Sequence, residues 1–183
     1  IVGSTGADRL EGGSGDDDIL GGYQDDRLYG NAGADELRGE YGADILDGGE
    51  GDDVISGGDD ADRLYGREGA DVLQGDAGDD RLEGGDGDDV LIGGEGTDQL
   101  YGGAGNDTYQ IDGREQFADD QIFDSAGERD VLEYTGTGHL RIKNFSYNNG
   151  IDEVDANGVT IYGDDANNSL NFQNVTFADE GQV

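Results

Sequence analysis

The chain has 183 residues, of which 45 are acidic and only 10 are basic, so its formal net charge is −35. That balance excludes nucleic acid as a partner, because phosphate contacts need lysine and arginine. The absence of cysteine excludes disulfides and thiolate metal sites. By charge and hydrophobicity alone the chain should be disordered, so we expect a divalent cation to cancel the charge.

Residues 3–110 repeat a nine-residue unit twelve times without a gap. The unit reads G-x-x-G-x-D-x-U-x, where U is a large apolar residue, and its position one is always glycine. Position four is glycine except at Gln24 and Asp60, and position eight is Leu or Ile except at Tyr109. Position six is aspartate in every copy: Asp8, Asp17, Asp26, Asp35, Asp44, Asp53, Asp62, Asp71, Asp80, Asp89, Asp98 and Asp107.

This spacing predicts a solenoid of six coils, each made of two nonapeptides. Positions seven to nine form a very short strand whose middle side chain points inward, and the glycine-rich positions turn the chain. Stacked coils then form two parallel sheets, and each coil buries its apolar face only against its neighbours. Ile1 is in register as a position-eight residue, so we expect the solenoid to continue upstream. The predicted core is Leu10, Ile19, Leu28, Leu37, Leu46, Ile55, Leu64, Leu73, Leu82, Leu91 and Leu100.

The position-six aspartates are predicted to bind calcium between successive turns. Repeats with odd numbers turn at one edge of the solenoid (the odd edge) and the others at the opposite edge (the even edge). Strands lie about 4.8 Å apart and calcium–oxygen distances are about 2.4 Å, so one ion reaches a carboxylate from each of two turns, with loop carbonyls completing its shell. Five gaps per edge give at most about ten sites, whose charge of about +20 nearly balances the −24 of residues 1–110.

Turn chemistry alone is the alternative explanation for aspartate at position six, but twelve copies at one phase favour calcium. The further acids at positions three and five, such as Asp16 and Asp88, either add negative charge around the calcium ligands or are simply solvated loop residues, and we favour the second reading. A 36-residue period is also present, since residues 21–56 and 57–92 share 21 identities. Gln24 and Asp60 fall at the same phase of it, and either could weaken a calcium site, with Asp tolerating the turn better than Gln.

Two columns of side chains are predicted on one outer sheet face. One reading is a platform for an acidic polysaccharide such as alginate, with tyrosines stacking on sugar rings and arginines binding carboxylates. The other, which we favour, is a ladder of Arg–Glu and Arg–Asp pairs with strand-favouring tyrosines. Position seven of the odd repeats supplies Arg9, Arg27, Ile45, Arg63, Arg81 and Gln99, and position nine supplies Glu11, Tyr29, Asp47, Tyr65, Glu83 and Tyr101.

Composition changes at residue 111, after which all five phenylalanines occur. We expect residues 111–183 to form a β-rich cap, because the last coil would otherwise expose an unpaired sheet edge. Hairpin turns are predicted at Asn148-Asn149-Gly150 and at Asn157-Gly158. A strand at 139–145 would place the basic side chains of His139, Arg141 and Lys143 on one face. These side chains could bind an anionic ligand, but we favour ion pairs with acidic residues of the cap. Predicted strands are 121–123, 130–134, 139–145, 151–154, 159–162 and 169–177.

No catalytic constellation is visible. The chain has one histidine and no cysteine, and acid pairs are so frequent that they carry no information about glycoside chemistry. We therefore expect a module that is not itself an enzyme. No apolar run approaches a membrane span, and no signal peptide is expected at the N-terminus.

Residues 1–110 resemble the RTX family of haemolysin-type calcium-binding proteins, and Gly102–Tyr109 followed by Ile111-Asp112 looks like the family's closing repeat. The resemblance implies a right-handed parallel β-roll (1–110) with multiple Ca²⁺ ions held by the aspartates named above. It further implies a secreted, extracellular bacterial protein that folds on calcium outside the cell, with the type I secretion machinery as its partner during export. Residues 111–183 would then be the place for a C-terminal secretion signal.

A weaker resemblance links the chain to short RTX modules of mannuronan epimerases, some of which bind alginate, although this chain has more repeats than those modules usually carry. The nonapeptide is shared by proteases, lipases, toxins and adhesins, so it does not name the activity of the parent protein. We expect the chain to be a monomer without a membrane span.

Overall fold

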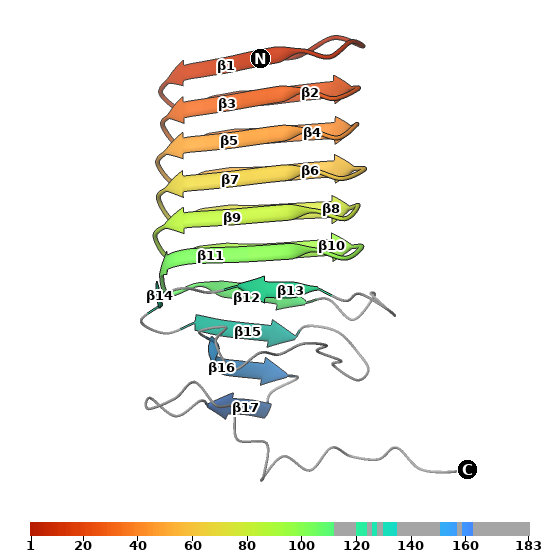
Figure 1. The fold of residues 1–183 in the computed structure, drawn as a ribbon. Coiled ribbons are helices and arrows are strands. Elements are labelled where there is room, and N and C mark those ends of the chain that lie inside the picture. Colours follow the sequence, from red (N-terminus) through yellow and green to blue (C-terminus); the bar gives the residue numbers. More distant parts are fainter. Residues whose placement is uncertain (112–119, 124–125, 128–129, 135–150, 157–158, 163–183) are drawn as a thin grey trace, which may run out of the picture.

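The computed structural model describes a single tall stack of coils built only from strands (Figure 1). The described part contains no helix, as predicted for an all-β solenoid. From β1 to β12 successive strands alternate between two sheets, because each nine-residue unit crosses from one sheet to the other. The described residues are 1–111, 120–123, 126–127, 130–134, 151–156 and 159–162.

The first sheet has the order β1-β3-β5-β7-β9-β11-β13, with β14 also paired to β11. Its strands are β1 (Arg9–Ser14), β3 (Arg27–Ala32), β5 (Ile45–Glu50), β7 (Arg63–Glu68), β9 (Arg81–Asp86), β11 (Gln99–Gly105), β13 (Gln121–Phe123) and β14 (Ala126–Gly127). The second sheet runs in the order β17-β16-β15-β12-β10-β8-β6-β4-β2. Its strands are β2 (Asp18–Tyr23), β4 (Glu36–Tyr41), β6 (Val54–Asp59), β8 (Val72–Ala77), β10 (Val90–Glu95), β12 (Thr108–Ile111), β15 (Asp130–Tyr134), β16 (Ile151–Ala156) and β17 (Val159–Tyr162).

The coil length is 18 residues, as predicted. Leu10 pairs with Leu28 in the first sheet and Ile19 with Leu37 in the second, both in parallel. The strands themselves are longer than predicted: most have six residues rather than three. They comprise positions seven to nine of one unit and positions one to three of the next, because the backbone stays in the ladder until position four. The turn is therefore confined to positions four to six.

The core is a single ladder of aliphatic side chains between the two sheets. Every predicted core residue from Ile19 to Leu100 is fully buried, and Leu10 packs partly buried against the end of the ladder. Tyr109 takes the same place in the last repeat and is also fully buried. Ile122 and Leu132, which lie beyond the repeats, extend the ladder by one further coil.

Positions two and four of the unit adopt the left-handed backbone conformation. Gln24 and Asp60 do so at position four, with φ of 70° and 78°, so both tolerate the turn despite their Cβ atoms. Four further non-glycine residues, which sequence reasoning overlooked, have positive φ at position two: Asn31, Glu40, Arg67 and Asp76. The six residues form three pairs separated by 36 positions, so the longer period repeats the strained positions as well as the sequence.

Several predicted cap strands are confirmed. The 121–123 and 130–134 runs coincide with β13 and β15, and those at 151–154 and 159–162 fall within β16 and β17. β16 and β17 pair antiparallel with Ala156 opposite Val159, as expected for a hairpin turn between them. The predicted strands at 139–145 and 169–177, the stripe of His139, Arg141 and Lys143, and the turn signals themselves lie outside the described residues.

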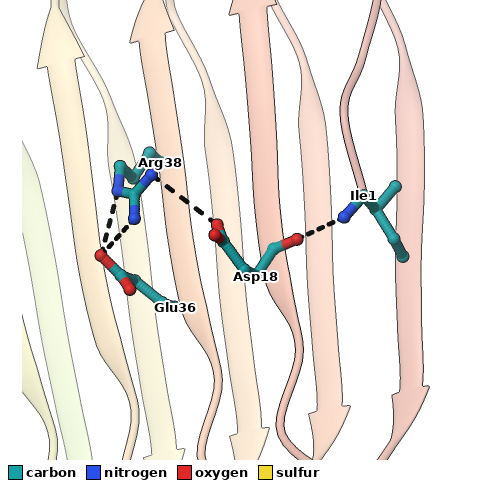
Figure 2. Close-up of polar contacts among 4 residues, drawn as sticks. All are labelled: Ile1, Asp18, Glu36 and Arg38. Atoms are coloured by element: carbon teal, nitrogen blue, oxygen red, sulfur yellow. Dashed lines mark hydrogen bonds and ion pairs between the residues drawn. The ribbon is translucent and has the colours of Figure 1, made fainter.

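Ion pairs occupy the outer face of the second sheet at its N-terminal end (Figure 2). Arg38 on β4 donates to Glu36 on the same strand and lies 3.7 Å from Asp18 on β2. The ammonium group of Ile1 donates to the backbone carbonyl of Asp18. These groups are exposed, so each pair contributes at most about 1 kcal/mol, and the stack depends on other interactions.

Candidate calcium sites

The structure brings the position-six aspartates into two columns, one along each edge. Ten of the twelve are buried with at most 2% of their surface exposed, and those of the first coil, Asp8 and Asp17, are half-buried. Burial of an ionised carboxylate is costly unless it is paired. The ten buried residues are Asp26, Asp35, Asp44, Asp53, Asp62, Asp71, Asp80, Asp89, Asp98 and Asp107.

From Asp26 onward, one carboxylate oxygen of each position-six aspartate accepts a hydrogen bond from the preceding coil. The backbone N–H of Asp44 donates to Oδ1 of Asp62 at 2.7 Å, and that of Asp62 donates to Oδ1 of Asp80 at 2.8 Å. The aspartate carbonyl accepts a second bond from the following coil, as Asp44 does from the N–H of Arg63 at 3.0 Å. The register of every coil is thus fixed at the edges as well as within the sheets.

The second oxygen has no such partner. Oδ2 of nine aspartates is buried without any hydrogen bond: Asp26, Asp35, Asp44, Asp53, Asp62, Asp71, Asp80, Asp89 and Asp98. Buried polar atoms in proteins are almost always paired, and each one left unpaired costs about 1–3 kcal/mol or more when charged. A column of such atoms therefore indicates a bound cation.

Position one is glycine because its Cβ site is already surrounded by oxygen. A Cβ added to Gly21 would lie 2.6 Å from Oδ2 of Asp26 and 2.9 Å from the carbonyl oxygen of Gly39 in the next coil. Both atoms are acceptors, and Oδ2 of Asp26 has no hydrogen-bond donor. Oδ2 is directed toward the following coil, whereas Oδ1 is directed toward the preceding one, so each aspartate serves two gaps.

Without metal, the buried carboxylates resist ionisation. Burial raises the pKa of Asp62 to about 8, opposed by the N–H donated by Asp44 and reinforced by the negative charges of Asp80 and Asp44. Burial likewise raises the pKa to about 7 at Asp89 and Asp98. It raises the pKa to about 6 at Asp44, Asp53, Asp71 and Asp80. In the metal-free fold, ionisation of these buried aspartates is therefore unfavourable.

The donor set fits calcium. Among the described residues no three Asp, Glu, His or Cys side chains gather into one cluster, so a site cannot be a carboxylate cage. Calcium accepts six to eight oxygens and takes backbone carbonyls readily. Carboxylates from two coils together with backbone carbonyls such as that of Gly39 provide hard oxygen ligands of this kind.

Aspartates at position five form a second column. Asp52 and Asp88 are exposed loop residues, as predicted, but they also link successive coils: Oδ1 of Asp52 accepts the backbone N–H of Ala70 at 2.9 Å, and Oδ1 of Asp88 accepts that of Asn106 at 2.8 Å. The hydrogen bonds from Asn106 also lower the pKa of Asp88. Each aspartate here faces a small or neutral residue in the next coil, an alternation with alanine that the sequence already displayed.

The aspartate ladder continues past the twelfth repeat. The N–H of Asp98 donates to Oδ1 of Asp120 at 2.9 Å, and that of Asp107 donates to Oδ1 of Asp130 at 2.9 Å. Both new residues open a D-x-U-x segment matching positions six to nine of the unit. Sequence reasoning missed them because the spacing changes from 18 residues to 22 and 23.

The predicted columns on the first sheet are present. Arg9 and Arg27 are partners in register, as are Tyr65 and Glu83. Arg9 and Arg81 pair with Glu11 and Glu83 along their own strands at 2.6 Å, and Arg67 pairs with Asp47 across strands. Arg9 also lies 4.1 Å from the centre of the Tyr29 ring, and Arg81 lies 4.0 Å from that of Tyr101. These arginines cover tyrosine faces, which disfavours the polysaccharide platform.

A stack of parallel coils with buried acceptor oxygens facing each turn defines a calcium-binding β-solenoid. The family model of the RTX calcium-binding nonapeptide repeat matches in four copies, at residues 2–37, 20–55, 38–73 and 74–109. The chain belongs to this family, and its repeats bind Ca²⁺ at multiple sites. No curated protein matches the chain. In the part that the structure describes, no helix could cross a membrane.

Proposed function

We propose that the chain is a calcium-triggered folding module of a larger secreted bacterial protein. Residues 1–110 form the calcium-binding roll, and residues 111–183 form its β-rich cap. The family's nonapeptide roll is a calcium-binding fold and not a catalytic one, so the activity of the parent protein resides elsewhere. The twelve position-six aspartates, from Asp8 to Asp107, are the proposed anionic ligands.

The observation that carries this proposal is the column of buried, unpartnered Oδ2 oxygens. Metal-free, the roll places carboxylates in a dry interior beside carbonyl oxygens, which raises their pKa values and opposes folding at neutral pH. Calcium in each gap supplies the missing positive charge. Binding free energy then becomes folding free energy, because the sites do not exist in the unfolded chain.

The dependence of folding on calcium also suits the chain to export. Extracellular calcium modules work at about 10⁻⁴–10⁻³ M calcium, well above the level in a bacterial cytosol. The chain would remain unfolded inside the cell, suited to passage through a type I secretion system, and would fold outside. Folding on the outer side would also favour one direction of transport.

The test is the size of the whole chain with and without metal. An unfolded chain of 183 residues has a radius of gyration of about 45 Å, and small-angle scattering would show that value in EGTA at pH 7.5. Addition of millimolar calcium should reduce it, whereas equal magnesium should not, because Mg²⁺ releases its waters reluctantly. A chain that is already compact in EGTA would refute the proposal.

A further inference from the structure

Beyond the twelve repeats the solenoid adds a seventh coil, made by β13 and β15. The backbone N–H of Gln121 donates to the carbonyl of Asp98 at 2.8 Å, and that of Val131 donates to the carbonyl of Asp107 at 2.7 Å, as position-seven residues do throughout the roll. Ile122 lies over Leu100, and Leu132 lies over Tyr109. This coil lies outside the residues that the family model matches.

The odd edge of this last gap shares two features with the gaps between repeats. Asp98 is fully buried, and its Oδ2 has no hydrogen-bond partner. In most repeats Oδ2 and a carbonyl oxygen of the following coil both lie close to the Cβ site of the position-one glycine, as those of Asp26 and Gly39 do at Gly21; at Gly93 the three nearest atoms all belong to Asp98. The following coil here is the one that carries Asp120, whose Oδ1 accepts the Asp98 N–H.

The even edge of the same gap is built differently. A Cβ at Gly102 would meet Oδ2 of Asp107 and, in place of a backbone carbonyl, the hydroxyl of Tyr109. That hydroxyl accepts the N–H of Gly102 at 2.9 Å. The tyrosine at position eight of the closing repeat thus reaches from the core to the position-one glycine, where its hydroxyl takes the place that a backbone carbonyl oxygen occupies in most other repeats.

We propose that the calcium series extends one gap past the repeats on the odd edge only, with the carboxylates of Asp98 and Asp120 as the anionic ligands of the added site. The even edge ends at Tyr109, and Asp130 there acts as a structural hydrogen-bond acceptor. This inference rests on the proposed calcium ligands of the repeats. It assigns a metal-binding role to a residue that the nonapeptide pattern does not contain.

The test compares single Asp→Asn substitutions in the full chain. Asparagine keeps the Oδ1 acceptor for the preceding N–H but removes the charge. In equilibrium dialysis at saturating calcium, Asp120→Asn should lower the calcium content by about one ion per chain. Asp130→Asn is the matched control at the other edge and should leave the content unchanged. Unchanged content in Asp120→Asn, or an equal loss in Asp130→Asn, overturns the proposal.

A third variant separates this result from failure of the general ligand assignment. Asp62→Asn lies within the repeats and should lose calcium whether or not the seventh coil binds it. Loss in Asp62→Asn without loss in Asp120→Asn refutes only the added site, whereas loss in neither refutes the ligand assignment as well. Anomalous scattering from calcium in crystals of the unmodified chain requires no variant. A peak between Asp98 and Asp120 supports the site, and peaks confined to the repeats refute it.

Discussion

Replacement of Asp62 by asparagine should stabilise the metal-free roll and at the same time reduce its response to calcium. Asp62 is central on the odd edge, and its pKa is raised to about 8. At pH 7 its carboxyl is ionised in the unfolded chain and protonated in the metal-free fold. Between pH 3.8 and 7, each pH unit therefore lowers the unfolding free energy of the metal-free fold by about 1.4 kcal/mol. Asparagine avoids this cost, so the metal-free fold should gain up to about 4 kcal/mol.

The same substitution should reduce the stability that bound calcium adds to the fold. With about 10 mM calcium and a dissociation constant of about 10⁻⁴–10⁻³ M, one site stabilises the fold by about 1.4–2.7 kcal/mol. Asp62 adjoins two gaps, so Asp62→Asn should lose about 3–5 kcal/mol of calcium-dependent stability. The slope of unfolding free energy against the logarithm of free calcium should fall in proportion to the sites lost.

Urea unfolding followed by circular dichroism gives both quantities. The EGTA series requires trimethylamine N-oxide to bring the metal-free transition into range. Asp59→Asn is the control, because it removes the same charge at an exposed position nearby and should shift stability by less than about 0.5 kcal/mol. Lower stability of Asp62→Asn in EGTA, or an unchanged calcium slope, would refute the assignment of Asp62 as a buried ligand.

Three further results are expected. Gly75→Ala should destabilise the calcium-loaded roll by more than about 3 kcal/mol in urea unfolding, because the new Cβ meets Asp80 Oδ2 and the Gly93 carbonyl. Gly13→Ala is the control: its Cβ would enter open space and only the backbone φ is strained, so it should cost about 1–2 kcal/mol. Equal losses of stability in the two variants would contradict the crowding argument. Leu64→Ala should cost about 2–5 kcal/mol with calcium present, and a cost below 1 kcal/mol would show that the core ladder is not tightly packed. In EGTA the unfolding free energy should fall as pH rises from about 4 to 8, since carboxyls with raised folded pKa values favour the fold only while protonated; a rise over that range would contradict the assigned burial.

The solenoid could be predicted from the sequence because strict spacing determines which residues stack. A nine-residue period with one inward apolar residue gives the 18-residue coil, the two sheets and the core from Ile19 to Leu100. Strand length was underestimated because glycine at position one was interpreted as part of the turn. In the structure it is an inward strand residue beside the aspartate carboxylate, a contact between positions one and six that spacing alone does not reveal.

The ends and the edges were harder to predict. Asp120 and Asp130 join the ladder after turns of altered length, so a search at fixed phase passes over them. The left-handed conformation of Glu40 and Arg67 is not predictable from their residue types. Position two varies in sequence, although its φ is positive in every repeat from Gly13 to Gly103. Such positions become predictable only when the 36-residue period is combined with a structure.

Simultaneous measurement of bound calcium and secondary structure in one titration tests the central claim most directly. At pH 7.5 the chain would be dialysed against free calcium from micromolar to about 10 mM, with circular dichroism recorded on each sample. Calcium uptake and strand signal should rise together, steeply, over the same concentrations. A full strand signal in chelator, followed by calcium uptake without spectral change, would contradict the claim that calcium binding and folding are one event.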